Sequence, residues 1–162
     1  MTQIEKSPEK VKLMQEAVNL SAEAVRIGGG PFGAVIVKNG EIVGRGNNKV
    51  TVNNDPTAHA EVSAIRDACK NLKTFDLSGC DLYTSCEPCP MCLAAAMWAR
   101  VNTIYYANDR NDAAKIGFDD ATFYKQFVIP TEERDIPMIR VEGTTALDVF
   151  KDWENKADKV EY

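Results

Sequence analysis

Four residues in the middle of the chain have the types and spacing needed for a catalytic metal centre. His59, the only histidine, lies two residues before Glu61, and Cys89 and Cys92 follow in a Pro-Cys-Pro-Met-Cys run. Zinc is tetrahedral, and imidazole nitrogen and thiolate sulfur are common protein ligands for it. Three ligands leave the fourth position to water, whose pKa zinc lowers from about 15.7 to about 7. The residues therefore predict one Zn²⁺ per subunit, with Glu61 beside the metal as the group that carries protons.

Two helices are expected to position these side chains. Pro56 is a start signal just before His59, and apolar residues recur at helical intervals from there onward. Cys89 and Cys92 lie three positions apart at the start of a second apolar segment, so they would share one helix face. The N-terminus of a helix favours thiolate over thiol, which is the form that zinc binds.

Cys86 allows an alternative interpretation of the same motif. It forms another C-x-x-C with Cys89, so that His59, Cys86, Cys89 and Cys92 could make a closed structural zinc site. Glu61 would then have no chemical task. The protein would be a non-enzymatic interaction module that zinc stabilises.

Composition and charge narrow the class of protein. The 162 residues fit one domain spanning 1–162, and the net charge of −5 makes nucleic-acid binding unlikely, because phosphate contacts rely on Lys and Arg. No stretch approaches the roughly 20 apolar residues of a membrane span, and the charged N-terminus lacks a signal-peptide run. We expect a cytoplasmic protein that binds no membrane and, given where its five cysteines fall, forms no disulfides.

The hydrophobic pattern predicts an α/β fold. Two apolar runs flank Asn39-Gly40, a pair typical of a hairpin turn, and later strands alternate with helices. This order favours a three-layer α-β-α sandwich with a mixed five-stranded sheet. The predicted strands are 32–38, 41–48, 80–85, 102–107 and 138–142. The predicted helices are 10–27, 59–72, 90–100, 118–127 and 145–160, with 48–58 as a polar loop and no element assigned to 108–117.

The motifs and the element order resemble the cytidine deaminase-like superfamily of zinc deaminases, which share the pattern H-x-E followed by P-C-x-x-C. Within it, the chain is similar to the small bacterial guanine deaminases over nearly its whole length. The similarity rests on the stretches GGPFGAVIVKNGEIVGRGNN, NDPTAHAEVSAIRDAC, LYTSCEPCPMCLAAAMWAR, IGFDD and KVEY. It implies hydrolysis of guanine to xanthine and ammonia, with a small purine as the binding partner.

The resemblance also implies substrate-binding roles. Asn48 would hydrogen-bond the base, and Asp120 would accept from the ring N–H and exocyclic amine of guanine. Phe32 and Trp98 would form aromatic walls that stack on the flat base, although an ordinary core position is the alternative for both. Ala60 would contact the substrate.

Tyr162 is assigned through the resemblance alone. By composition a C-terminal tyrosine would be a frayed end. In the guanine deaminases that the chain resembles, the C-terminal segment crosses to the partner subunit and closes its active site. We therefore expect a domain-swapped homodimer in which residues from about 145 to 162 are exchanged and Tyr162 covers the neighbouring pocket.

Two other deaminase activities use the same zinc motif. One is deamination of tRNA adenosine, which requires the base to be extruded into the pocket. The net charge of −5 and the acceptor at Asp120 argue against it. The other is deamination of a different small heterocycle or nucleoside, such as cytosine, guanosine or an aminotriazine.

Overall fold

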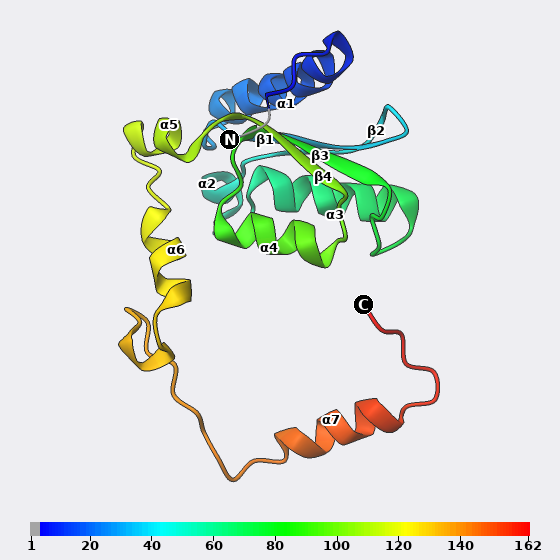
Figure 1. Ribbon diagram of the computed structural model, residues 1–162, viewed down its shortest axis with the longest axis vertical. Helices are drawn as coiled ribbons and strands as arrows, with labels where there is room; N and C mark the ends of the chain where they lie inside the picture. Colours follow the sequence, from blue (N-terminus) through cyan, green and yellow to red (C-terminus); the bar gives the residue numbers. More distant parts are fainter. Residues whose placement is uncertain (1–3) are drawn as a thin grey trace. The chain divides into compact units, whose positions relative to one another are not determined.

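The computed structural model describes residues 4–162, in which a mixed four-stranded sheet carries the predicted hairpin (Figure 1). The strands β1 (Gly33–Lys38) and β2 (Glu41–Asn47) pair antiparallel. Asn39 and Gly40 join them with φ of 51° and 81°, the positive values that a two-residue type I′ turn requires. β1 also pairs antiparallel with β3 (Cys80–Cys86), which runs parallel to β4 (Thr103–Asn108), giving the order β2-β1-β3-β4.

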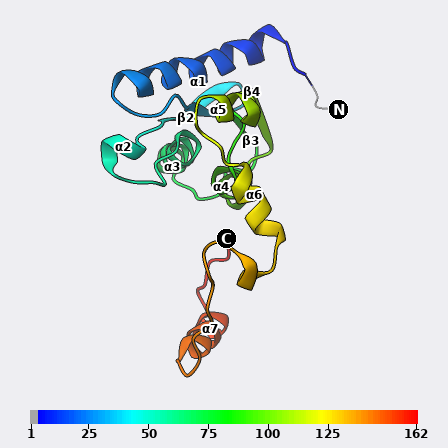
Figure 2. The ribbon, with the colours of Figure 1, turned by 90° about the vertical axis from the view of Figure 1, so that its left-hand side faces the viewer.

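Helices cover both faces of this sheet (Figures 1 and 2). α1 (Pro8–Arg26) lies on one face, and α3 (Ala60–Leu72) and α4 (Pro90–Trp98) lie on the other. Alternate residues of a strand point to opposite faces, so β1 contributes to two cores. Ala34 and Ile36 are buried on the α3 side, and Val35 and Val37 on the α1 side. The predicted α-β-α layering is confirmed.

The fifth strand predicted at 138–142 is wrong. Within the described part of the chain these residues join no ladder, and the sheet has four strands instead of five. A β-branched segment becomes a strand only where another strand satisfies its backbone N–H and C=O groups, and its own composition does not supply that partner.

Two short helices lie where the sequence pattern predicted none. α2 (Val50–Asn53) interrupts the predicted polar loop, and α5 (Arg110–Lys115) follows β4. Asp109 caps α5 by accepting from the backbone N–H groups of Asn111 and Asp112. The Asp- and Asn-rich composition is therefore a helix start signal. The remaining elements are α6 (Ala121–Val128), η1 (Thr131–Glu133) and α7 (Ala146–Asn155).

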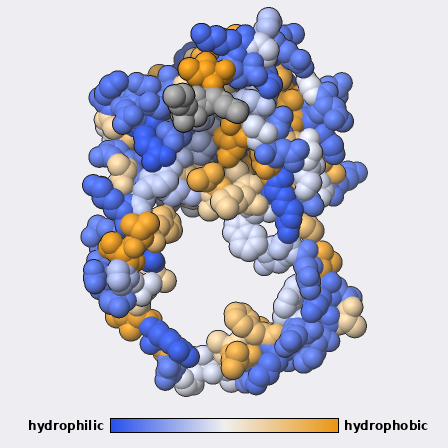
Figure 3. Space-filling model, in the orientation of Figure 1, coloured by the Kyte–Doolittle hydropathy of each residue, from blue (hydrophilic) through white to orange (hydrophobic). Residues whose placement is uncertain are grey.

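The chain divides into two compact units, with the boundary between Ala121 and Thr122. The second unit, 122–162, contains no buried residue of its own. Large hydrophobic side chains lie at its surface instead (Figure 3). Examples of these exposed hydrophobic residues are Phe127, Val128, Ile139, Val141 and Phe150.

No helix in the described part of the chain has both the length and the apolar character to cross a membrane.

Gly46 allows α3 to lie directly against β2. A Cβ at this position would be 2.2 Å from the carbonyl oxygen of Ala60 and 2.4 Å from the backbone nitrogen of Ala64. We expect Gly46→Ala to lower the free energy of unfolding by about 2–3 kcal/mol, because backbone atoms of a packed helix must move. Denaturant unfolding measures this. Arg45→Ala, at the exposed adjacent position, is the control and should change stability by less than about 0.5 kcal/mol.

Candidate zinc centre and active site

The two zinc-binding segments begin as the sequence predicts. His59 is the N-cap of α3 and Cys89 is the N-cap of α4, both with extended backbone. Cys92 lies in the first turn of α4 and is fully buried. Packing of α3 and α4 on the same face of the sheet brings the histidine to the two cysteines.

The three ligand atoms have the spacing of a tetrahedral zinc site. His59 Nδ1 lies 3.6 Å from Cys89 Sγ and 3.4 Å from Cys92 Sγ. With a Zn–S bond of about 2.3 Å and a Zn–N bond of about 2.0 Å, a nitrogen and a sulfur ligand in tetrahedral geometry lie about 3.5 Å apart. Among residues 4–162, these three side chains form the group of possible ligand atoms that lie within 4.8 Å of one another. The donor set and its geometry therefore fit zinc.

The two cysteine sulfurs lie within hydrogen-bond contact of each other. The Cys92 thiol donates to Cys89, which lowers the pKa of Cys89 to about 4, and nearby His59 adds to this effect. The same hydrogen bond raises the pKa of Cys92. Zinc binds the thiolate form of cysteine, so both thiols would be deprotonated in a zinc-loaded site.

Glu61 lies in the first turn of α3 and is 6% exposed. Burial raises the pKa of its carboxyl group. Thr84 Oγ1 lies 3.3 Å from Glu61 Oε1 and donates to the Cys86 carbonyl oxygen at 3.0 Å. A raised pKa makes the carboxyl group a stronger base than an exposed glutamate, which suits the predicted role of taking up and passing on protons.

Cys86 does not join the three ligands. Its thiol donates to the carbonyl oxygen of Asp109 at 3.7 Å, and burial raises its pKa to about 11. It therefore stays a thiol in a hydrogen bond that points to the β4–α5 loop. This arrangement does not favour the closed structural zinc site, and it leaves a three-ligand centre of the catalytic kind.

Asn48 and Phe32 lie in the first of the two compact units. Phe32 comes just before β1, and Asn48 comes just after β2. Asn48 is buried, and its Oδ1 accepts from the backbone N–H groups of Gly30 at 3.1 Å and Val50 at 3.3 Å. These bonds fix the amide through its oxygen atom. Phe32 contacts Phe118 edge to face, with ring centroids 4.9 Å apart. Phe118 was not among the predicted site residues, although it belongs to the IGFDD stretch that carries part of the resemblance.

Asp120 lies within electrostatic reach of the metal ligands. Burial raises the pKa of its carboxyl group, and the charge of Cys89 raises it further. Asp120 in turn helps to raise the pKa of His59, although Cys89 is the main cause. Ala60, between the histidine ligand and Glu61, is fully buried at the start of α3.

Trp98 and Tyr162 are not enclosed within the single chain. Trp98 ends α4 and is 65% exposed, and Tyr162 is 68% exposed in the second unit. Their assigned roles as pocket wall and pocket cover therefore remain predictions. Thr84 is a polar neighbour of Glu61 that the sequence analysis missed, because nothing in its local sequence indicates the contact.

The sequence profile of the cytidine and deoxycytidylate deaminase zinc-binding region matches residues 7–108, which include all three candidate ligands and Glu61. The chain belongs to this deaminase family. This confirms the resemblance noted from the motifs, and zinc as the metal of the site.

Two similar proteins and one solved structure show how far the likeness to known deaminases extends along this chain. Guanine deaminase from Bacillus subtilis (strain 168) is 55% identical over 150 residues, which cover 92% of this chain and 96% of that protein. The X-ray structure of guanine deaminase from Bacillus subtilis matches with a TM-score of 0.90 at 54% identity, covering 94% of this chain and 98% of that chain. The tRNA-specific adenosine deaminase of Aquifex aeolicus is 41% identical over 98 residues, 60% of this chain and 65% of that protein.

Proposed function

We propose that this deaminase hydrolyses guanine to xanthine and ammonia. The observation that carries the proposal is the extent of the similarity to guanine deaminase, which covers 92% of this chain. The similarity to tRNA-specific adenosine deaminase covers only 60%. The difference matters because Asp120 and Tyr162, the residues assigned to base recognition and pocket closure, lie outside the family zinc-binding region at 7–108.

Glu61 is the proton carrier in the proposed reaction. Zinc held by the three ligands lowers the pKa of a water molecule and so supplies a nucleophile at neutral pH. Glu61 takes a proton from the water that adds to C2 of guanine and delivers it to the adjacent ring nitrogen. It then transfers the second proton of that water to the amine, which leaves as ammonia. Burial and the contact with Thr84 hold the carboxyl group in place.

Asn48 and Asp120 account for selectivity. The Asp120 carboxylate would accept from N1–H and the exocyclic amine of guanine, while the Asn48 amide would donate to an acceptor of the base. Adenine has no hydrogen on N1, so it would leave the Asp120 acceptor without that partner in the closed site, which is costly. Phe32, braced by Phe118, would pack against the ring face.

We further propose that the active unit is a homodimer that exchanges its C-terminal segment. The supporting observation is that 122–162 contains no buried residue and exposes many hydrophobic side chains. Such a segment needs a surface to cover its hydrophobic side chains, and exchange between identical chains is a low-cost way to provide one. A cytoplasmic location remains part of the proposal, supported by five cysteines that are all free.

An ammonia-release assay on the zinc-loaded protein tests the substrate. We expect guanine to be preferred over adenine by at least about 10³-fold in kcat/KM. Guanosine, cytosine and an anticodon stem-loop should be poor substrates. If the protein deaminates one of these compounds in preference to guanine, that compound would be assigned as the substrate instead. Absence of ammonia from all of them would favour the non-enzymatic zinc module.

A further inference from the structure

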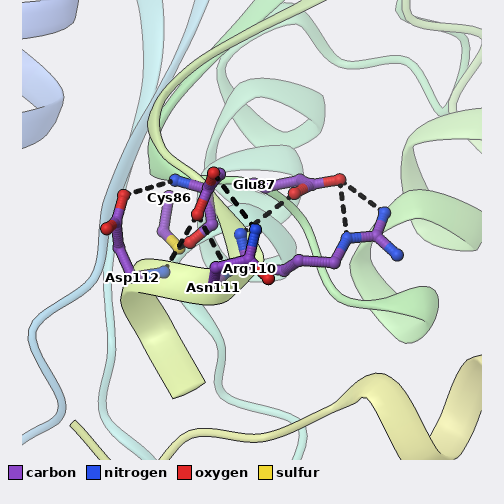
Figure 4. Close-up of polar contacts among 6 residues, drawn as sticks. Cys86, Glu87, Arg110, Asn111 and Asp112 are labelled. Carbon is purple, nitrogen blue, oxygen red and sulfur yellow. Dashed lines mark hydrogen bonds and ion pairs between the residues drawn. The ribbon is translucent and has the colours of Figure 1, made fainter. Parts of the chain in front are cut away.

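An ion pair ties the loop before α4 to the start of α5 (Figure 4). Glu87 Oε1 accepts from Arg110 Nε at 3.1 Å and from Nη2 at 2.5 Å, and Oε2 accepts from the Arg110 backbone N–H at 3.0 Å. The backbone N–H of Glu87 donates to the carbonyl oxygen of Asn108 at 2.8 Å. Glu87 therefore holds the start of α5 with both carboxylate oxygens and the end of β4 with its backbone N–H.

The two tied segments lead to different parts of the site. β3 and β4 are parallel, and Cys86 pairs with Asn108 at their carboxyl ends, so both chains leave the sheet at one edge. The chain after β3 reaches the ligand Cys89 two residues beyond Glu87. The chain after β4 passes through α5 and reaches Asp120.

The segment between Arg110 and Asp120 is short and internally bonded. The Asp109 capping box starts α5, and the backbone N–H of Phe118 donates to the Ala113 carbonyl oxygen at 3.0 Å. A shift at the start of α5 would therefore be passed to Asp120. The pKa of Asp120 is raised mainly by burial; Arg110 opposes this rise and Glu87 adds to it, so both charges act on this carboxyl group.

We propose that Glu87 and Arg110 are positioning residues that set the place of Asp120 relative to the metal ligands and so determine the affinity for the base. The inference rests on the proposed function, because it takes Asp120 as the acceptor for guanine. The Glu87 side chain is 21% exposed and the Arg110 side chain 42%, so their ion pair contributes little to folding stability. Its loss should therefore be visible in substrate binding.

Displacement of Asp120 is expected to have a kinetic effect that differs from that of a structural defect. The hydrogen bonds that Asp120 makes to the base are present in both the ground state and the transition state. Weakening them raises KM and leaves kcat almost unchanged. A purely structural role would instead lower zinc content, thermal stability and kcat together.

Variants at both ends of the pair test this. We expect Arg110→Ala and Glu87→Gln each to raise KM for guanine about tenfold with kcat within about threefold, one zinc per chain and little change in Tm. Arg110→Lys keeps the charge but not the bidentate contact. Its KM should therefore lie between that of the unaltered enzyme and that of Arg110→Ala. The double variant should be no worse than the single ones, because both act through one link.

Lys115→Ala is the matched control. Lys115 belongs to the same helix and pairs with Asp112 at 3.0 Å, a contact that stays within α5. Its loss should leave KM and kcat at the values of the unaltered enzyme. A rise in KM equal to that of Arg110→Ala would show that any change in α5 disturbs the site and would overturn the proposal.

A binding measurement gives a readout that does not depend on turnover. In a Glu61→Gln background, guanine should bind about tenfold more weakly when Arg110→Ala is added, as measured by calorimetry. Unchanged KM and unchanged affinity in a folded, zinc-loaded Arg110→Ala protein would overturn the inference while leaving the proposed function intact. If Arg110→Ala does not fold, Glu87→Gln and Arg110→Lys decide by the same criteria. An unaltered enzyme that neither binds nor deaminates guanine would overturn both proposals.

Discussion

Glu61→Gln is expected to lower kcat for guanine by about 10²–10⁴-fold while zinc stays bound. The amide cannot carry the proton from water to the ring nitrogen and the amine. It has nearly the size of the carboxyl group and can keep the hydrogen bond to Thr84, so packing at the start of α3 should be preserved. The three candidate ligands, His59, Cys89 and Cys92, are all retained in this variant. Ammonia release and metal analysis on the same preparation measure both effects.

Glu23→Gln is the control for this prediction. Glu23 is exposed on α1, across the sheet from the site, so its loss of charge should not alter turnover. A Glu61→Gln protein that deaminates guanine at the normal rate would show that another group carries the proton. Loss of zinc from this variant would show that Glu61 also stabilises the metal centre.

Removal of residues 158–162 is expected to lower kcat/KM about 10²-fold while leaving zinc content and Tm nearly unchanged. The deleted residues include none that is buried within the chain, so folding should not depend on them. Activity should depend on them if Tyr162 covers the pocket and excludes water. Ammonia release measures activity, and size-exclusion chromatography measures the oligomeric state. Full activity in the truncated protein would contradict the proposed cover.

A mixing experiment tests whether the cover acts between chains. Truncated chains have an intact Glu61 but no cover, and full-length Glu61→Gln chains have a cover but no proton carrier. Co-expression should form hybrid dimers in which the tail of the second chain closes the site of the first, so that activity reappears. If each tail covers its own site, hybrids should stay inactive, and this result would refute the exchange.

The parts of the fold that depend on local chemistry were predictable. Asn39-Gly40 predicts a tight hairpin turn, because those residue types adopt the positive φ that the turn requires. Cys89 and Cys92 lie on one helix face because they are three residues apart. α5 was missed although Asp109 and Asp112 form a recognisable capping box, so its signal was present in the sequence.

The fifth strand shows where local pattern stops being informative. Residues 138–142 have the composition of a strand, yet their backbone finds no ladder in the described chain. A strand is stabilised by its neighbour, and the neighbour is chosen by contacts between segments that are distant in sequence. The residues of the segment itself carry no information on whether a neighbouring strand is available to pair with it.

The residue types alone predicted a zinc centre, since one imidazole and a cluster of thiols leave few other chemistries, and they placed a carboxyl group beside it as the candidate proton carrier. Only the tertiary structure decided which cysteine is excluded, because Cys86 bonds to Asp109 across the β3–β4 edge. The same edge places Glu87 against Arg110, and the packing of α3 on the sheet places Thr84 against Glu61. The two residues of each pair are 23 positions apart in the sequence. Such contacts follow from strand register and helix packing, which no local spacing encodes.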